Sequence, residues 1–235
     1  MQRYFSNRQK DSYFELQEDD YYHIKTVMRM KDGDHIQVVY HDVPYLCAVK
    51  MIGEEVKIQV LNQMEQQNEI IPDVTLFIPI LKEQKMDYIF QKATELGVNR
   101  FIPVMMERCV IKLDSKEEKK LTRWKRIVKE ASEQSMRTSI PVVENIVKLK
   151  DIEADGLKLL CSTVEKENTI KRVFQNDKKC DKMSVLIGPE GGLSQTEENW
   201  LMDKGFFPVT LGPRIMRVET VPLYLMSIIN YEYME

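Results

Sequence analysis

Hydrophobic and polar positions follow two different periods, and the change falls near Pro72. Before it, apolar residues alternate with polar ones over short stretches bounded by turn residues, which predicts β-strands. These strands are His35 to Tyr40, Tyr45 to Met51 and Val56 to Val60. From Asp19 to Met30 the spacing becomes helical, with Ile24, Val27 and Met28 on one face. Short strands so closely spaced favour a small β-barrel.

After Pro72, continuous apolar runs alternate with amphipathic helical patterns. The runs predict strands at Val74–Ile80, Arg100–Met105, Leu157–Ser162, Ser184–Ile187 and Pro208–Leu211. Four helices are predicted. The first is Lys85 to Leu96, and the last follows Thr220. The other two begin at capping boxes, one formed by Ser115 with Glu118 and one by Ser194 with Glu197. Continuous apolar strands suit a parallel sheet covered on both faces, so the pattern predicts an α/β domain.

The boundary between the two patterns gives the domain prediction. Asn62 to Glu69 is polar and rich in Gln and Asn, which is typical of a linker. We therefore expect a small β domain at 1–70 and an α/β domain at 74–235.

Composition narrows the class of protein. Of 235 residues, 43% are hydrophobic, enough for a sizeable core, and no apolar run approaches the length of a membrane span. The N-terminus has no signal-peptide core, and the four cysteines lack metal-ligand spacing. We expect a cytoplasmic protein with reduced thiols, no membrane segment and no metal.

Charge is distributed unevenly along the chain. The net charge is −3, but 100–137 holds eleven Lys or Arg against six Asp or Glu, a local balance of 11 − 6 = +5. Such a stripe can attract nucleic-acid phosphates. It is equally typical of a solvated helix face whose charges pair at i,i+4. The stripe alone does not decide between these interpretations.

Two glycine–proline loops near the C-terminus predict a ligand site. One is 186–194, LIGPEGGLS, and the other is 211–220, LGPRIMRVET; each follows a predicted strand. Open α/β sheets bind ligands where strands end, and glycine lets the backbone approach closely. Neither loop has a P-loop or dinucleotide fingerprint, and Glu190 would repel a phosphate. A neutral or cationic ligand, such as a nucleoside with a sulfonium centre, therefore suits the loops better than a phosphate does. The alternative is that both loops are simple tight turns that bind nothing, with Gly212 at a positive φ; two similar loops with nearby arginines favour a ligand site.

Arg214 and Arg217 are the candidate chemical groups of the second loop. In an irregular segment both guanidinium groups could point the same way and recognise a phosphate or a base. The alternative is that they pair with Glu190 or Glu219. No catalytic triad or paired carboxylates stand out, which favours group transfer governed by positioning and electrostatics.

Taken together, these motifs resemble the RsmE family of SPOUT-class methyltransferases. Similarity extends over nearly the whole chain and includes both loops, together with 85–98, 108–114, 130–137 and the N-terminal 3–5 and 23–30. The resemblance implies a PUA-like RNA-binding β-barrel followed by a SPOUT-type α/β domain with a C-terminal trefoil knot. It further implies methylation of N(3) of a uridine in 16S ribosomal RNA, S-adenosyl-L-methionine as cofactor, and a homodimer.

The resemblance also assigns site residues. It implies catalytic roles for Arg217 and Arg214, which would stabilise an anionic uracil, and for Glu219, which would orient them. Implied cofactor-binding residues are Ser162, Thr163, Gly188, Pro189, Glu190, Gly191, Gly192, Leu211, Gly212, Ile215 and Met216. Implied RNA-binding residues are Arg3, Arg29, Lys112 and Arg137. Two positions depart from the family pattern: Val218 stands where threonine is common, and Val221 where a small residue is common.

Two other functions remain open at this stage. A SPOUT methyltransferase could act on a ribose 2′-hydroxyl or on transfer RNA. A non-catalytic RNA-binding factor in ribosome assembly could use the barrel and the basic helix alone. Binding of S-adenosyl-L-methionine would distinguish the non-catalytic factor from either kind of methyltransferase.

Overall fold

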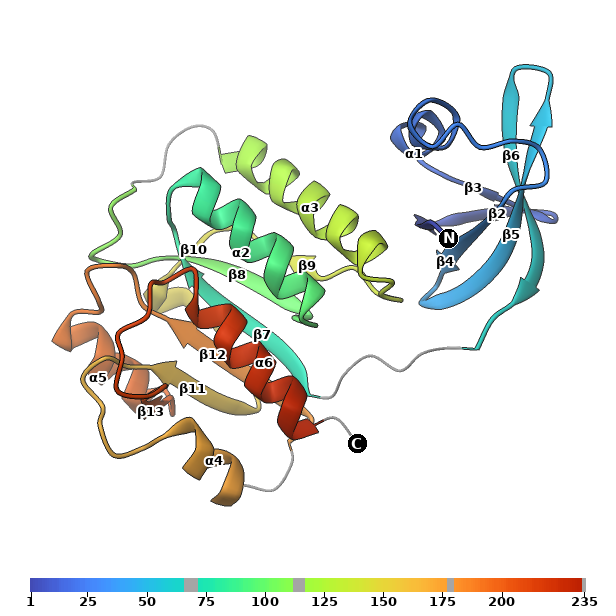
Figure 1. Ribbon diagram of the computed structural model, residues 1–235. Coiled ribbons are helices and arrows are strands. Elements are labelled where there is room, and N and C mark those ends of the chain that lie inside the picture. Colours follow the sequence, from blue (N-terminus) through green and yellow to red (C-terminus); the bar gives the residue numbers. More distant parts are fainter. Residues whose placement is uncertain (66–71, 112–116, 177–179, 234–235) are drawn as a thin grey trace. The chain divides into compact units, whose positions relative to one another are not determined.

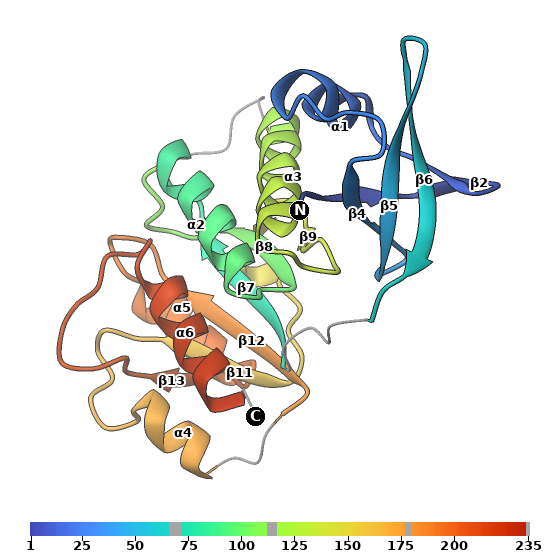
Figure 2. The ribbon, with the colours of Figure 1, turned by 45° about the vertical axis from the view of Figure 1, so that its right-hand side comes forward.

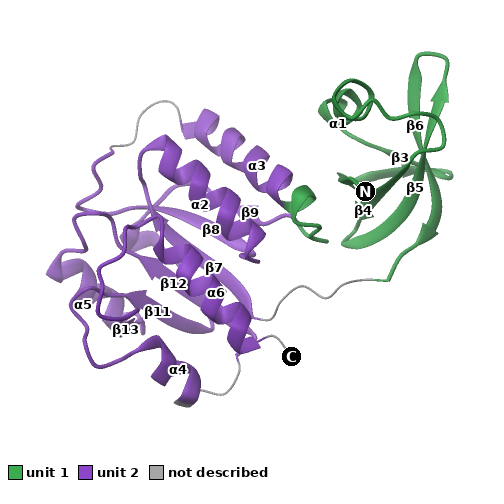
Figure 3. Cartoon of the chain, in the orientation of Figure 1, with its two compact units in different colours: residues 1–69, 132–139 green, residues 70–131, 140–235 purple. Residues whose placement is uncertain are grey.

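The computed structural model describes residues 1–65, 72–111, 117–176 and 180–233. The chain divides into two compact units, which Figure 3 shows in different colours. One contains residues 1–69 together with 132–139, and the other contains 70–131 together with 140–235.

The first unit is a six-stranded β-sheet with the order β1-β4-β5-β6-β3-β2. Its strands are β1 (Arg3–Ser6), β2 (Arg8–Lys10), β3 (Tyr13–Glu15), β4 (His35–Tyr40), β5 (Val43–Ile52) and β6 (Glu55–Gln63). The predicted alternation is visible in the core, where Ile36 and Val38 of β4 pack with Cys47 and Val49 of β5. Neighbouring strands are antiparallel except for β1 and β4, which are parallel.

Three details of this unit differ from the predictions. The helix expected over 19–30 is α1 (Glu18–Tyr22) followed by the π-helix η1 (His23–Val27). Met28 donates its amide to the carbonyl of His23, an i→i+5 bond, and this wider turn shifts the side chains around the axis. Ile24 is therefore buried while Val27 is 58% exposed. β6 also continues to Gln63 into the expected linker, and β1 to β3 were not predicted.

The second unit is built on a parallel sheet with the order β10-β8-β7-β12-β11-β13, and β9 also pairs with β8. Its strands are β7 (Asp73–Pro79), β8 (Arg100–Met105), β9 (Val142–Val143), β10 (Val147–Lys148), β11 (Leu157–Cys161), β12 (Lys182–Ile187) and β13 (Phe207–Val209). Every pairing is parallel, as the continuous apolar runs predicted. The short strands β9 and β10 were not predicted, because two residues carry no period.

Helices cover both faces of this sheet. They are α2 (Glu83–Glu95), α3 (Glu117–Gln134), η2 (Leu149–Asp151), α4 (Ile170–Asn176), α5 (Gln195–Asp203) and α6 (Val221–Tyr233). Leu76 and Ile78 of β7 face the core shared with α2, α3, α4 and α6, whereas Phe77 faces the one shared with α5. Figures 1 and 2 show α2 and α6 side by side over the sheet. Of these helices, α4 and the three-residue η2 were not predicted.

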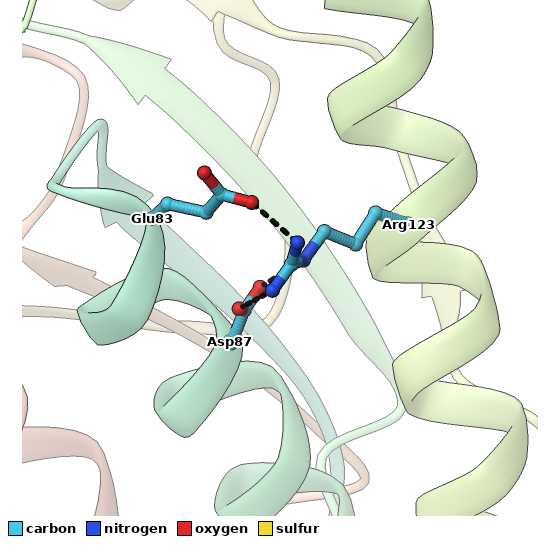
Figure 4. Close-up of polar contacts among 3 residues, drawn as sticks. All are labelled: Glu83, Asp87 and Arg123. Carbon is cyan, nitrogen blue, oxygen red and sulfur yellow. Dashed lines mark hydrogen bonds and ion pairs between the residues drawn. The ribbon is translucent and has the colours of Figure 1, made fainter.

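Helices α2 and α3 are joined by a stacked aromatic pair and by a salt bridge. Phe90 and Trp124 stack with their ring centroids 4.9 Å apart. Arg123 donates from Nε to Asp87 at 3.1 Å and also pairs with Glu83 (Figure 4). This cation of the basic stripe is therefore engaged within the unit. The capping box predicted at Ser115 lies outside the described residues.

Candidate functional site

A cavity of about 590 Å³ lies where three neighbouring strands of the parallel sheet end. Its walls come from the segments that follow β11, β12 and β13, and from Lys85 near the start of α2. The carboxyl ends of adjacent strands meet at one edge of a parallel sheet, which explains how three loops distant in sequence form one wall. The volume is in the range of small-molecule sites.

The loop after β12 is fixed from behind by Arg108. Its Nη1 donates to the carbonyl oxygens of Gly191 at 3.0 Å and Leu193 at 3.2 Å. A Cβ on Gly191 would stand 3.2 Å from the Cβ of Arg108, so glycine permits this close packing. Ser194 ends the loop and caps α5 through the predicted capping box with Glu197. The loop therefore presents its backbone to the cavity from a fixed position.

The loop after β11 is held by its own acidic side chain. The carboxylate of Glu165 accepts hydrogen bonds from the backbone amides of Lys166, Glu167 and Asn168. These amides, that of Asn168 most, hold the pKa of Glu165 below its usual range. Lys166 in turn donates to the carbonyl of Thr163 at 2.7 Å and lines the cavity. The structure thus places an ordered turn and a cation beside the cavity.

The loop after β13 is irregular, as expected for the segment that carries the two arginines. Gly212 has a φ of +123°, which only glycine adopts without strain, and its amide donates to Thr210 Oγ1. Ile215 is 84% exposed, and Arg214 and Arg217 are exposed as well. Thr220 closes a turn by donating to the carbonyl of Arg217, and α6 begins at the next residue.

Lys85 connects two of the loops. Its ammonium lies 2.9 Å from Glu190 Oε1 and 3.0 Å from Glu219 Oε2. The two carboxylates, that of Glu190 first, raise the pKa of Lys85. Burial opposes the charge of Glu219, but its own backbone amide and Lys85 outweigh burial, and its pKa is lowered. The interpretation that the arginines pair with Glu190 or Glu219 is wrong, because Lys85 engages both carboxylates.

The guanidinium groups of Arg214 and Arg217 make no hydrogen bond or ion pair to any described residue. Both line the cavity. The only electrostatic link is that the charge of Arg217 also helps to lower the pKa of Glu219. Two exposed guanidinium groups without counter-ions are suited to bind an anion or a group that becomes anionic.

The cavity brings together most of the predicted site. All eleven expected cofactor-binding residues line it, from Ser162 to Met216, together with both arginines. Glu219 does not line it, but its carboxylate lies 3.0 Å from the ammonium of Lys85, which does. Nothing in the sequence assigns Lys85 or Lys166 to the site, because both resemble ordinary surface lysines. Val218 and Val221, the two departures, are buried against the core at the cavity wall.

The four expected RNA-binding residues have different environments. Arg29 is exposed, and Lys112 lies outside the described residues. Arg3 is only 4% exposed and donates to Gln37 Oε1 and to the carbonyl of Arg137, all within the first unit. Arg137 is 7% exposed. Burial of these two side chains favours a structural role over direct contact with RNA.

The described helices include none long and apolar enough to cross a membrane. Within the described ranges there is likewise no cluster of three His, Cys, Asp or Glu side chains that could hold a metal ion.

Comparisons with known proteins agree with this architecture. Residues 67–230 match the family described as RNA methyltransferase domain, and residues 16–61 match the RNA methyltransferase PUA domain. The parallel sheet, its cavity and these matches define the class as RNA methyltransferases with an N-terminal PUA domain.

Full-length relatives narrow the class. Ribosomal RNA small subunit methyltransferase E of Bacillus subtilis is 32% identical, with 99% of this chain and 97% of the relative covered. The Mesomycoplasma hyopneumoniae protein of the same name is 31% identical, with 97% and 98% covered. The crystal structure of the Neisseria gonorrhoeae protein of that name, bound to S-adenosyl methionine, has a TM-score of 0.87 at 26% identity, with 99% and 98% covered. The chain belongs to the ribosomal RNA small subunit methyltransferase E family.

The resemblance to the RsmE family is thereby confirmed, as is the prediction of a PUA-like β domain before an α/β methyltransferase domain.

Proposed function

We propose that this protein methylates N(3) of a uridine in 16S ribosomal RNA, using S-adenosyl-L-methionine bound in the cavity at the ends of β11, β12 and β13. The observation that carries the proposal is the cavity itself. The cavity joins three loops that are distant in sequence. The fold of the whole chain matches that of a relative whose crystal structure contains this cofactor. The expected trefoil knot belongs to the same proposal, with these loops threaded around the cofactor.

The residues present fit this cofactor. The backbone of Gly188 to Gly192 and the irregular segment from Leu211 can offer amides and carbonyls to an adenine edge. Ile187 and Val221 supply apolar wall, and Lys166 offers a cation for a carboxylate. When bound, S-adenosyl-L-methionine supplies an electrophilic methyl group on a cationic sulfur. A wall of backbone dipoles without a phosphate-binding motif suits such a ligand.

Arg217 and Arg214 are the proposed catalytic residues. The N(3)–H of uracil is weakly acidic, and the ring becomes negatively charged as its proton leaves to solvent. The N–C bond then forms as the bond between the methyl carbon and the cofactor sulfur breaks, which leaves both products neutral at these atoms. Two guanidinium groups without counter-ions can stabilise that charge. N(3) lies on the Watson–Crick edge, so the base must be unpaired when it enters the site.

The role proposed for Glu219 is positional. It lies in the turn between Arg217 and the start of α6, and its carboxylate is bound to Lys85. Glu219 therefore holds the arginine-bearing segment from its C-terminal side. It orients Arg217 through the turn rather than through a salt bridge.

For RNA binding, we propose that Lys112, the basic α3 and Arg29, which is exposed, supply phosphate contacts. Arg3 and Arg137 would contribute by shaping the first unit, since both are buried.

We also propose that the protein forms a homodimer through α2 and α6. Tyr88 of α2 and both Tyr224 and Tyr231 of α6 are exposed, although the two helices lie side by side. Exposed aromatic side chains on adjacent helices are typical of protein interfaces.

The proposal is tested by methyl transfer from labelled cofactor to purified small subunits, with naked 16S RNA as a second substrate. We expect one methyl group per RNA, located on a uracil base by mass spectrometry of the nucleosides. A methyl group on ribose, or activity towards transfer RNA only, would contradict the proposed substrate and support the alternative methyltransferase function. Cofactor binding without transfer to any RNA would favour the assembly-factor alternative.

A further inference from the structure

Seven charged side chains of the second unit lie at one cavity, and their pairing is asymmetric. Glu219 lies beside the cavity, and the others line it: Lys85, Lys166, Glu190, Glu198, Arg214 and Arg217. Lys85 binds both Glu190 and Glu219, at 2.9 and 3.0 Å, whereas the guanidinium groups of Arg214 and Arg217 have no hydrogen-bond or ion-pair partner among the described residues. Four cations and three anions could pair in several ways. The structure selects the arrangement in which one lysine engages two of the acids.

This arrangement is not the one that ion-pair chemistry alone would favour. A guanidinium binds a carboxylate through two parallel hydrogen bonds, and is less strongly hydrated than an ammonium. Arg217 already acts electrostatically on Glu219. If Lys85 were absent, Glu190 in the cavity wall and Glu219 beside the cavity would both lose their cation. The two guanidinium groups, which have no partner among the described residues, line the same cavity. Glutamate–arginine pairs would then form and occupy the groups that the substrate needs.

We propose that Lys85 is a positioning residue that keeps Glu190 and Glu219 engaged, and thereby keeps Arg214 and Arg217 available to the anionic uracil. The location of Lys85 supports this role. It lies in the first turn of α2, a helix anchored to the sheet through the buried Met86, Ile89 and Phe90. The ammonium therefore comes from a rigid element, whereas both carboxylates come from loops. The effect of Lys85 on catalysis rests on the proposed function, whereas its pairing with the two glutamates does not.

Helix α2 provides a matched control. Lys92 also forms an ion pair, 2.8 Å from Glu95, with a side chain 35% exposed against 30% for Lys85. It does not line the cavity. K92M thus removes the same side chain and a similar ion pair from the same helix without touching the site.

The kinetic test compares wild type, K85M, K85R, K92M and the triple variant K85M/E190Q/E219Q in the labelled-methyl assay. We expect K85M to lower kcat about tenfold, with the cofactor KM within about threefold of wild type. K85R should stay within about threefold of wild type, and K92M should equal it. The triple variant removes the competing carboxylates together with the ion pair that holds Glu219, so its kcat should lie several times above that of K85M but below that of wild type. Equal kcat for K85M and K92M, or a triple variant no better than K85M, overturns the inference.

A second readout does not depend on turnover. Phenylglyoxal modifies guanidinium groups, and mass spectrometry gives the rate at each arginine. Arg214 and Arg217 should react rapidly in wild type, several times more slowly in K85M, and rapidly again in the triple variant. Unchanged rates in K85M contradict the inference even if methyl transfer is observed. A wild type that transfers no methyl group, but shows these rate changes, contradicts the proposed function and leaves the pairing established.

Discussion

At the scale of single residues, the cavity is notable for two guanidinium groups that have no counter-ion among the described residues. Arg217 lines the cavity and follows directly on the segment that carries Gly212, with its φ of +123°, and the exposed Ile215. We expect Arg217→Ala to lower kcat about a hundredfold, because one donor to a developing negative charge is worth that much. Cofactor affinity, measured by calorimetry, should change less than about threefold, since the loss occurs in the transition state.

Arg100→Ala is the control for that variant. Arg100 is also an exposed arginine, paired with Glu144 at 3.1 Å, but it begins β8 and so lies at the amino ends of the strands, opposite the cavity. Its removal should leave kcat unchanged. Near wild-type turnover by Arg217→Ala would show that the guanidinium has no catalytic role.

The ion pairs of Lys85 have a predictable pH dependence. The pKa of Glu219 is lowered, so its stabilising contribution is complete above its unfolded value of 4.5 and is lost as the pH falls through the folded value. The pKa of Lys85 is raised above 10.5, so its charge persists throughout the neutral range. We expect the difference in Tm between wild type and K85M to be constant from about pH 8 to 6 and to shrink below about pH 4.5. A difference that grows on acidification would contradict this assignment.

Residue chemistry also explains what the sequence could not reveal about the site. The glycine loops were recognisable because two similar loops follow apolar strands and the second carries Arg214 and Arg217. Lys85 was not, because its partner Glu190 is 105 positions away and nothing local distinguishes this lysine from Lys92. Conversely, Arg3 and Arg137 carry the charge expected of RNA-binding residues, and only the fold shows that they are buried.

At the scale of elements, the cap of α5 connects helix stability to the position of the cofactor loop. Ser194 accepts a hydrogen bond from the amide of Glu197, and the Glu197 carboxylate accepts from the amides of Ser194 and Glu107. We expect Ser194→Ala to lower the free energy of unfolding by about 1 kcal/mol, the usual effect of losing an N-cap. Both tryptophans, Trp124 and Trp200, belong to the second unit, so urea unfolding followed by their fluorescence reports on that unit.

Ser227→Ala on α6 is the matched control. Its hydroxyl is exposed and donates only to the carbonyl of Leu223 within the same helix, so its loss should change stability by less than about 0.5 kcal/mol. Equal effects of the two substitutions would mean that the capping box does not stabilise α5 measurably.

The accuracy of the sequence predictions depended on the length and burial of each element. β8 was predicted to the residue, because five of its six side chains lie fully or partly inside a parallel sheet and the run is continuous. β2 was missed because all three of its residues are exposed. The helix expected over 19–30 was partly wrong, because a π-helical turn has no distinct hydrophobic period.

At the scale of the whole molecule, the change of sequence pattern near Pro72 predicted two domains, and the structure divides into two units. The segment 132–139 nevertheless belongs to the first unit, although it begins in the last turn of α3, whose preceding residues belong to the second. No periodicity could show this, because it depends on hydrogen bonds such as that from Arg3 to the carbonyl of Arg137, which join residues 134 positions apart. Long-range contacts of this kind are invisible to any local pattern. The position of a segment in the chain therefore does not determine the compact unit to which it belongs.

The proposed dimer is also a property of the whole molecule, and it gives the last prediction. One chain has a mass of 27.7 kDa, so light scattering after size exclusion should give 2 × 27.7 = 55.4 kDa for wild type. Tyr224→Glu places a charge on the exposed face of α6, where an interface core excludes charge, and should shift the mass towards 27.7 kDa. Tyr22→Glu makes the same change at an exposed tyrosine of the first unit and should leave the dimer intact. A Tyr224→Glu variant that remains at 55.4 kDa would place the interface elsewhere, and a wild type at 27.7 kDa would mean that a single chain forms the complete cofactor site.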